Sequence, residues 1–528
     1  MADLAPTDDL LIPLADATLP LAVGLDLGSS SARAVAMDAW GRAVARVKLP
    51  YAWTATTGGR VEVDPDLVAD LADQAVDGVL ARLGEAAGSV AALGGSALWH
   101  SLVGVDAAGR PATPATLWGD RRAVREAADL ATELDAAAAR ERTGSHLHPS
   151  FPPARIRWYQ EHEPALAARV ARWCTLADYI AWRRTGALVQ SVSLASASGL
   201  YDQLAGDWDR EILAALRLTP DHLPQLVERD EPLPPLLGAY ADRWAPIAGA
   251  PWYPDVGDGV AANVGSGCLT PRRLALTVGT TAAVRVVTEH PPRAIPPGLF
   301  RYQLDRRRSV VGGATSNAGN GVVWLAGLTR LPEPPELDAE IARRSPGAHR
   351  LDVLPFLAGE RSPSWSLAAV GVVEGLTLAT TPVDLAHAWM EAVAYRCALL
   401  RDALAGDTTL GVPADAPLVV SGSALRHYPS WLQIFADVLG APVTLPANTE
   451  SSARGAALLA LDAAGALPAP LPEVAERDAV HGRAARVVQP APARHAVYRR
   501  LMARHARLEA RVPLEHPDPG SADATPAA

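Results

Sequence analysis

The feature that most constrains the fold is a pair of similar segments, one near the N-terminus and one past the middle of the chain. The first is "VGLDLGSSSARAVAMDAWGR" (residues 23–42), and the second is "RRLALTVGTTAAVRVVTEH" (residues 272–290). In each, an apolar run meets a glycine followed by hydroxyl side chains, and a second apolar run comes after them. This pattern predicts two antiparallel strands joined by a polar tip. Two such hairpins indicate an internal repeat, with one copy in each of two domains.

The length of the chain also predicts two domains. The chain has 528 residues, whereas single hydrophobic cores stop growing at about 250–300 residues. Strand patterns alternate with Ala- and Leu-rich helical patterns at residues 66–87, 123–142 and 164–172, which is typical of the α/β class. We therefore expect a short tail over residues 1–20, one domain over 21–268, a second over 269–512, a disordered tail over 513–528, and a cleft between the domains.

The composition excludes several classes of function. Lys48 is the only lysine, and its context "ARVKLPYAW" fits neither a P-loop, nor a protein kinase, nor a pyridoxal enzyme. The net charge of −10 and the lack of a basic block argue against a nucleic-acid partner. No apolar run approaches the ~20 residues of a membrane helix, and the acidic start lacks the basic region of a signal peptide. We expect a cytoplasmic protein with a small-molecule partner.

The two hairpin tips are candidate phosphate-binding loops. Backbone N–H groups and hydroxyls on tips from two domains can bind one anion from opposite sides, which makes a lysine unnecessary. An ordinary β-turn is the alternative interpretation of each tip taken alone. Asp26 ends the first strand, where its carboxylate can cap the turn or can hold Mg²⁺ through water.

A third segment, "DVGDGVAANVGSG" (residues 255–267), offers a candidate general base. It places Asp258 between two glycines, just before a small-residue helix. An aspartate in this position can simply cap the helix. Exposed in a cleft, the same carboxylate can accept a proton from a hydroxyl that attacks phosphorus. The sequence pattern supports both readings equally.

Aromatic and polar side chains gather in "GGSALWHSLVGVDAAGRPATPATLWGDRRA" (residues 94–123). Trp99, His100 and Asp120 suit a polyol, which offers C–H faces to an aromatic ring and hydroxyls to polar groups. A histidine near a strand end is also common as a satisfied core residue. His146 and His148 follow at a spacing that fits no helix-borne zinc site.

Taken in order, these segments resemble the FGGY family of carbohydrate kinases. The resemblance extends over about residues 21–511 and is carried by "GLDLGSSSARA", "RVEVDPDL", "WHSLVGVDAAGRPATPATLWGDRRA", "GDGVAANVGSG", "TVGTT", "VSGSALRHYPSWLQIFADVLGAPV" and "ESSARGAALLAL". It implies two actin-like (ribonuclease H-like) domains that close around ATP and a sugar in a central cleft. It also implies Mg²⁺ as a cofactor, near Asp26.

The resemblance assigns a role to each matching position. Asp258 resembles the catalytic base of the family. The nucleotide-binding positions are Ser29, Ser30, Ser31, Arg33, Gly279, Thr280, Thr281, Gly319, Gly422 and Arg426. The sugar-contacting positions are Trp99, His100, Asp120 and Gly259.

Within the family, the chain looks most like a gluconokinase. The segments that carry this likeness are "SALWHSLVGVD", "TGSHLHPSFPPARIRWY", "SVSLASASGLYDQLAGDWD" and "LPFLAGERSPSW". Trp99 replaces a smaller residue and Val323 replaces a glutamine that often helps to hold the nucleotide, so a xylulokinase-like or other polyol kinase is the alternative. A non-catalytic, ATP-gated actin-like module is a more remote one.

Gluconate carries a carboxylate, so its pocket needs a cationic or strong hydrogen-bonding partner. The gluconokinase-like segments supply five candidates: Arg121, Arg155, Arg157, His100 and His148. Salt bridges within the fold are the alternative role for all of them. The sequence leaves a homodimer open.

Overall fold

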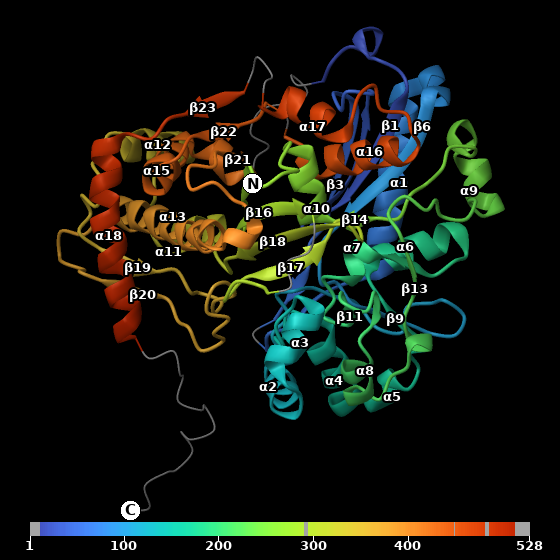
Figure 1. Cartoon of the computed structure of the whole chain (residues 1–528), viewed down its shortest axis with the longest axis horizontal. Coiled ribbons are helices and arrows are strands. Elements are labelled where there is room, and N and C mark those ends of the chain that lie inside the picture. Colours follow the sequence, from blue (N-terminus) through green and yellow to red (C-terminus); the bar gives the residue numbers. More distant parts are fainter. Residues whose placement is uncertain (1–10, 57, 290–293, 448, 481–484, 513–528) are drawn as a thin grey trace, which may run out of the picture.

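A computed structural model describes residues 11–56, 58–289, 294–447, 449–480 and 485–512. The chain forms two α/β domains that lie side by side in Figure 1, the first running from blue to green and the second from yellow to red. The orange-red helices α16 (Ser451–Ala463) and α17 (Leu471–Val480) return from the second domain to lie over the first. The tail expected at residues 513–528 lies outside the described residues.

The first domain is built on a five-stranded sheet with the strand order β14-β6-β1-β2-β3. The strands are β1 (Leu21–Leu27), β2 (Ser31–Met37), β3 (Ala43–Pro50), β6 (Val90–Ala97) and β14 (Val256–Gly257). β1 pairs with β2 antiparallel and with β6 parallel. The buried carboxylate of Asp38 accepts backbone hydrogen bonds from Trp40 and Arg42 and so fixes the β2–β3 turn.

The second domain repeats this arrangement in a seven-stranded sheet with the order β17-β18-β16-β15-β21-β22-β23. The strands are β15 (Leu274–Val278), β16 (Ala282–Glu289), β17 (Phe300–Gln303), β18 (Arg308–Ala314), β21 (Leu418–Ser421), β22 (Val443–Leu445) and β23 (Arg486–Val488). β15 pairs with β16 antiparallel and with β21 parallel, as β1 does with β2 and β6. The internal repeat predicted from the two hairpins is therefore a repeat of sheet topology.

Helices cover both sheets. The longest are α1 (Pro65–Leu83), α13 (Pro382–Gly406) and α18 (Pro492–Arg511), and the second domain also contains α15 (Pro429–Leu439). The others in the first domain are α2 (Val124–Glu133), α3 (Ala136–Thr143), α4 (Pro152–His162), α5 (Pro164–Ala167), α6 (Leu176–Thr185), α7 (Val192–Ala195), α8 (Arg210–Ala215), α9 (Gly238–Arg243) and α10 (Asp258–Gly265). The second domain adds α11 (Gly319–Leu328), α12 (Pro334–Ala342) and α14 (Ala424–His427).

Short strands outside the two sheets complete the fold. They are β4 (Thr54–Ala55), β5 (Val61–Val63), β7 (Val103–Val105), β8 (Ala115–Thr116), β9 (Arg172–Cys174), β10 (Val189–Ser191), β11 (Tyr201–Asp202), β12 (Asp207–Trp208), β13 (Gln225–Val227), β19 (Asp352–Leu354) and β20 (Val372–Glu374). The helix expected over residues 123–142 is in fact two helices. Asp135 interrupts it because its side chain caps the backbone N–H groups of Ala137 and Ala138.

Helix α16 binds the first domain through glycines. A Cβ atom added to Gly455 would lie 1.9 Å from the carbonyl oxygen of Ala261 in α10, and one added to Gly265 would lie 1.9 Å from that of Ser451. Gly24 of β1 has the same relation to the carbonyl oxygen of Ala453, at 2.1 Å. Only glycine permits such close backbone contact, so α16, α10 and β1 are packed into one unit.

No helix among the described residues is both long and apolar enough to cross a bilayer.

The close packing of α10 on α16 predicts a steep cost for a single methyl group. We expect Gly455→Ala to lower the free energy of unfolding by about 1–3 kcal/mol or more, because the new Cβ meets backbone that cannot rotate away. Gly406→Ala is the matched control, since a Cβ there has no atom within 4 Å. Differential scanning calorimetry should show a lower midpoint for the first variant and an unchanged or higher one for the second. Equal midpoints would contradict the packing argument.

Candidate active site

A cavity of about 210 Å³ lies between the two sheets. Both domains contribute to its walls. The first supplies Ser29, Leu98, Trp99, His100, Trp118, Ser150, Phe151, Asp258, Gly259 and Ala262, and the second supplies Thr277, Gly279, Thr280, Thr281, Ala283, Arg285, Phe300, Tyr302, Ala314, Arg361, Trp365 and Ser452. The cavity therefore unites residues from both hairpin tips with the expected base and several of the expected sugar contacts.

Asp258 stands at the first turn of α10 and borders the cavity. One carboxylate oxygen accepts the backbone N–H of Gly259 at 2.7 Å. Burial raises the pKa of this carboxyl group to about 6, while the positive charge of Arg285 opposes the rise. The carboxylate is consequently ionised at neutral pH and is close enough to neutrality to take up a proton.

Arg285 is a cavity residue that the sequence analysis did not identify. It lies on β16 and is only 5% exposed, with Nε donating to Asn263 Oδ1 at 3.0 Å and Nη2 to Thr277 Oγ1 at 2.7 Å. No carboxylate among the described residues lies within ion-pair distance of it. The signal in the sequence is one arginine inside the otherwise apolar strand "AAVRVV".

The two hairpin tips meet at this cavity. Ser29 and Thr280 are exposed and line the same space, although they come from different domains. Each tip is closed by a backbone hydrogen bond, from Gly28 N to Ser31 O at 3.1 Å and from Gly279 N to Thr281 O at 2.9 Å. Their hydroxyls are donors of the kind that a phosphate chain requires.

The other residues of the first tip face away from the cavity. Ser31 is buried and its hydroxyl accepts from Arg33 Nε at 3.0 Å. Arg33 Nη1 also donates to Asp26 at 2.8 Å, and its guanidinium lies 3.6 Å from Glu450. Ser30 is exposed and its carbonyl accepts the backbone N–H of Tyr51. Neither Arg33 nor Ser30 is among the described residues that line the cavity.

Asp26, the expected magnesium-binding residue, has two hydrogen-bond donors beside its carboxylate. It is 3% exposed, and one oxygen accepts from Arg33 while the other accepts from Ser96 Oγ at 2.7 Å. Each oxygen keeps further lone pairs, which can accept from a metal-bound water. The neighbouring guanidinium opposes direct contact with a divalent cation. These donors therefore fit an outer-sphere role and not direct coordination.

An aromatic wall faces the base. Phe300 and Tyr302 stack at 4.3 Å between ring centroids, and Trp99 meets Tyr302 edge-on at 4.8 Å. The indole ring of Trp99 packs directly against Gly259, and a Cβ added to that glycine would lie 2.3 Å from the ring. Gly259 thus makes room for the tryptophan. The wall presents apolar faces of the kind that pack against the C–H groups of a sugar.

His100 presents an acceptor to the same cavity. Its Nδ1 lies 2.7 Å from the carbonyl oxygen of Ala197, which assigns the proton to Nδ1 and leaves the lone pair on Nε2. Burial lowers the pKa of the imidazole to about 3, so the ring is neutral. A neutral Nε2 can accept a hydrogen bond from a substrate hydroxyl.

Asp120 lies outside the cavity wall. It is 1% exposed and accepts from Val61 N at 3.0 Å and from Arg122, with the shortest contact at 2.7 Å from Nη2. Arg122, two positions later in the chain, forms an ion pair with the carboxylate that was expected to contact the sugar. The contact between Asp120 and a sugar stays a prediction, and in this arrangement the carboxylate is paired with Arg122 and not directed at the cavity.

The predicted nucleotide residues Gly319, Gly422 and Arg426 lie behind the second tip. A Cβ added to Gly319 would lie 2.6 Å from Gly279 O, and one added to Gly422, whose φ is +104°, would lie 2.2 Å from Val278 O. Both glycines let the chain approach the tip closely. Arg426 Nη2 donates to the carbonyl of Pro446 at 2.7 Å.

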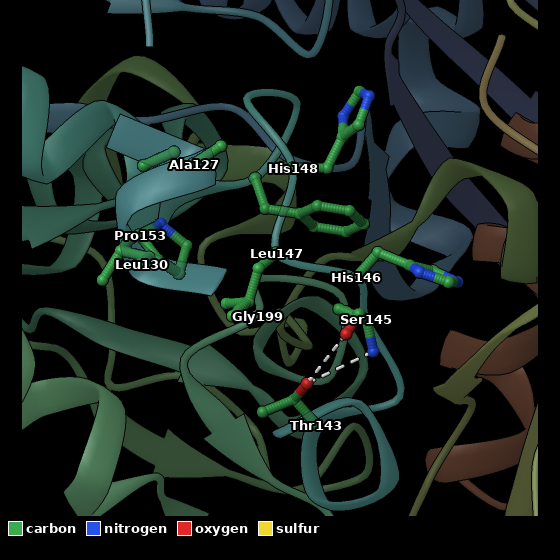
Figure 2. A pocket seen from close by; sticks show the side chains of 11 residues that line it. Ala127, Leu130, Thr143, Ser145, His146, Leu147, His148, Pro153 and Gly199 are labelled. Carbon is green, nitrogen blue, oxygen red and sulfur yellow. Dashed lines mark hydrogen bonds between the residues drawn. The ribbon is translucent and has the colours of Figure 1, made fainter. Parts of the chain in front are cut away.

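A second cavity of about 10 Å³ lies beside the first, with room for one water. Figure 2 shows Thr143 hydrogen-bonded to Ser145 at its edge, and the imidazoles of His146 and His148 pointing away from its apolar side chains. Both imidazoles contact Trp365, at 4.3 and 5.3 Å between centroids. This small cavity cannot hold a sugar.

The three arginines that were expected to be able to bind a substrate carboxylate each interact with other groups of the protein. Arg157 pairs with Glu133 at 2.5 and 2.8 Å. Arg155 is buried and donates to Thr116 Oγ1 and to the carbonyls of His100 and Ser150. Arg121 is exposed and donates to the carbonyl of Leu367 at 3.3 Å. None of the three lines the cavity.

Comparison with known proteins gives a consistent result. Family models for the FGGY family of carbohydrate kinases match residues 21–265 with the N-terminal domain and residues 274–464 with the C-terminal domain. A gluconokinase from Bacillus subtilis is 28% identical over 84% of this chain and 87% of that protein. A xylulose kinase from Escherichia coli is 30% identical over 84% and 90%, respectively.

Solved structures share the fold. A xylulose kinase from Lactobacillus acidophilus has a TM-score of 0.82 at 25% identity, covering 93% of this chain and 98% of that one. A gluconate kinase from the same organism has a TM-score of 0.81 at 25% identity, with the same coverage. The two-domain α/β fold expected from the sequence is confirmed, and the relatives do not single out one substrate.

The raised pKa of Asp258 predicts a pH-dependent stability difference between the wild type and Asp258→Asn. The folded state holds this proton up to about pH 6, whereas the ordinary value is 3.8. The wild type therefore loses stability, relative to the variant, as pH rises from about 4 to 6, and the difference becomes constant above pH 7. Denaturant unfolding of both proteins between pH 4 and 7.5 measures it. A difference that does not change with pH would contradict the assignment.

Proposed function

Because the chain belongs to the FGGY family of carbohydrate kinases, we propose that it transfers the terminal phosphoryl group of ATP to a hydroxyl of gluconate, giving 6-phosphogluconate. The observation that carries the kinase reaction is Asp258, a carboxylate with a raised pKa in a cavity that both hairpin tips share. A xylulokinase-like activity is the second candidate, because the indole of Trp99 occupies space at the floor of the cavity and a shorter sugar needs less room.

Asp258 acts on the attacking hydroxyl. Its carboxylate accepts the hydroxyl proton as the oxygen bonds to the terminal phosphorus of ATP, and the bond from that phosphorus to the bridging oxygen breaks to release ADP. Such positioned bases contribute about 10²–10⁴-fold to rate, and they work best with a pKa near the working pH. The pKa of about 6 meets this condition.

Groups from both domains hold the phosphates. The hydroxyls of Ser29 and Thr280, with the backbone N–H groups of the tips, donate to phosphate oxygens, and Arg285 adds a positive charge beside the reacting group. When bound, Mg²⁺ neutralises charge that develops on the phosphates, and Asp26 would hold it through water. Closing the cleft brings the two tips together and excludes water from the transfer.

Gluconate is supported by the charge of the cavity. Two guanidinium groups, those of Arg285 and Arg361, line it together with one carboxylate, that of Asp258. Burying arginines without a counter-charge is costly, so a binding partner with several negative charges fits this cavity. ATP with a sugar acid supplies more of them than ATP with a neutral sugar. Similarity to the Bacillus subtilis gluconokinase agrees with this choice.

The base assignment predicts that Asp258→Asn lowers kcat at least ~100-fold, because the amide cannot accept the proton. ATP binding should change little, since the phosphates are held by other groups. Steady-state kinetics and ATP titration by calorimetry measure the two quantities. The wild-type kcat should also fall below about pH 6, as Asp258 becomes protonated. A variant with near wild-type turnover would reject this role.

A screen of ATP consumption tests the substrate. Gluconate should give a kcat/KM at least ~10-fold above that of xylulose or glycerol, which is the effect of one charge-assisted contact of about 1.4 kcal/mol. Mass spectrometry and NMR of the product should locate the phosphate on the terminal hydroxyl. If xylulose reacts faster than gluconate, the substrate assignment is wrong, while the kinase reaction still holds.

A further inference from the structure

Arg361 is a buried cation whose charge no described residue neutralises. It follows Glu360 in the segment "LPFLAGERSPSW" and is 9% exposed. Its backbone N–H donates to Ser316 Oγ at 3.1 Å, and Nη2 donates to the carbonyl of Thr315 at 2.7 Å. These bonds fix the side chain without balancing its charge. Its guanidinium lies over the ring of Trp118, 4.5 Å from the centroid.

The remaining donors of this guanidinium are available to a ligand. Nε is buried and has no hydrogen-bond partner among the described residues, and no carboxylate there lies within 4.0 Å of the group. The neighbouring Glu360 is turned away, because it pairs with Arg396. Burial lowers the pKa of Arg361 to about 10, which still leaves it charged at neutral pH. A charged fork of this kind is suited to an anion that binds with two oxygens.

A second unpaired donor lies nearby. His148 Nδ1 accepts the backbone N–H of Ser150 at 3.1 Å, so the proton of the neutral ring is on Nε2. This Nε2 is buried without a partner, and the imidazole is only 7% exposed. The charge of Arg361 contributes to lowering the pKa of both His148 and His100, after the larger effect of burial. Arg361 therefore lies close to both imidazoles.

Two ligand groups carry an anion of suitable shape: the carboxylate of a sugar acid and the terminal phosphate of ATP. Arg285 lies at the phosphate side, bonded to Thr277 on the strand that leads to the second tip. Arg361 instead lies over Trp118, and it interacts electrostatically with Tyr302, Asp258, His100 and His148. These surroundings favour the carboxylate end of the substrate.

We propose that Arg361 binds the carboxylate of an aldonate substrate and that it selects sugar acids over neutral sugars. The inference rests on the kinase function proposed above, and it assigns to Arg361 the discrimination between charged and neutral substrates. Trp118 packs against the guanidinium from one side. The hydrogen bond from Ser150 N to His148 Nδ1 positions that imidazole to add a neutral donor. The predicted candidates Arg121, Arg155 and Arg157 are not required for this contact.

The test compares Arg361→Met and Arg361→Lys with the wild type on gluconate and on glucitol, in which a CH₂OH group replaces the carboxylate. We expect Arg361→Met to raise the KM for gluconate about 10–100-fold and to change kcat less than about 3-fold. The KM for glucitol and the KM for ATP should stay within about 2-fold. Arg361→Lys keeps the charge but loses the planar fork, so its effect should be intermediate.

Arg125→Met is the control, since its side chain is exposed on the first domain, does not line the cavity and pairs with Asp129 at 3.6 Å. It removes one positive charge from the protein and should leave both KM values unchanged. Thermal unfolding checks that each variant is folded. If Arg361→Met does not fold, Arg361→Lys carries the same comparison between gluconate and glucitol.

Three results would overturn the inference. An equal loss on gluconate and glucitol would give Arg361 a structural role, and an increase in the KM for ATP with every substrate would assign it to phosphate. A loss in kcat alone would place it in the transfer step. These outcomes differ from failure of the proposed function, in which the wild type itself produces no phosphorylated gluconate.

Discussion

The geometry of the cavity depends on the backbone contact between α10 and α16. Gly265 and Gly455 allow the two helices to approach until an added Cβ at either glycine would lie 1.9 Å from a carbonyl oxygen of the other. Asp258 begins α10, and Ser452 at the start of α16 also lines the cavity. Because the glycines bring these helices into backbone contact, the position of Asp258 is fixed by a helix that comes from the other half of the chain.

Arg454, the neighbour of Gly455 in α16, reinforces this contact. The guanidinium is 1% exposed and donates to the carbonyls of Gly41, Gly265 and Ala475, at 3.1, 2.8 and 3.0 Å. It thereby joins the β2–β3 turn, the end of α10 and α17. The chain then continues from α10 into β15 and the second tip, so α10 connects Asp258 in the first domain directly to the hairpin tip of the second.

Local patterns were enough to predict the parts of the site that depend on the backbone. The hairpin tips at Ser29 and Thr280 and the helix start at Asp258 are marked by neighbouring glycines, and the structure brings all three residues to one cavity. Side-chain pairing was not predictable in the same way. Asp120 is occupied by Arg122, and whether such a carboxylate faces a ligand or a neighbour depends on rotamers and tertiary contacts that no spacing reveals. Arg285 and Arg361 were not predicted as cavity residues for the same reason. What makes them candidate anion-binding groups is that no described carboxylate lies within ion-pair distance of either, and the sequence does not show this.

These two arginines also explain how the chain manages without a lysine in the cavity. A guanidinium stays charged when buried, because its ordinary pKa is so high that burial lowers that of Arg361 only to about 10. A buried lysine would approach neutrality under the same burial. The cavity consequently keeps a net positive charge even when Asp258 is ionised, and this charge is balanced only when anionic ligands fill it. This electrostatic imbalance favours the binding of anionic ligands, and the positive charge of Arg285 also helps to keep Asp258 ionised.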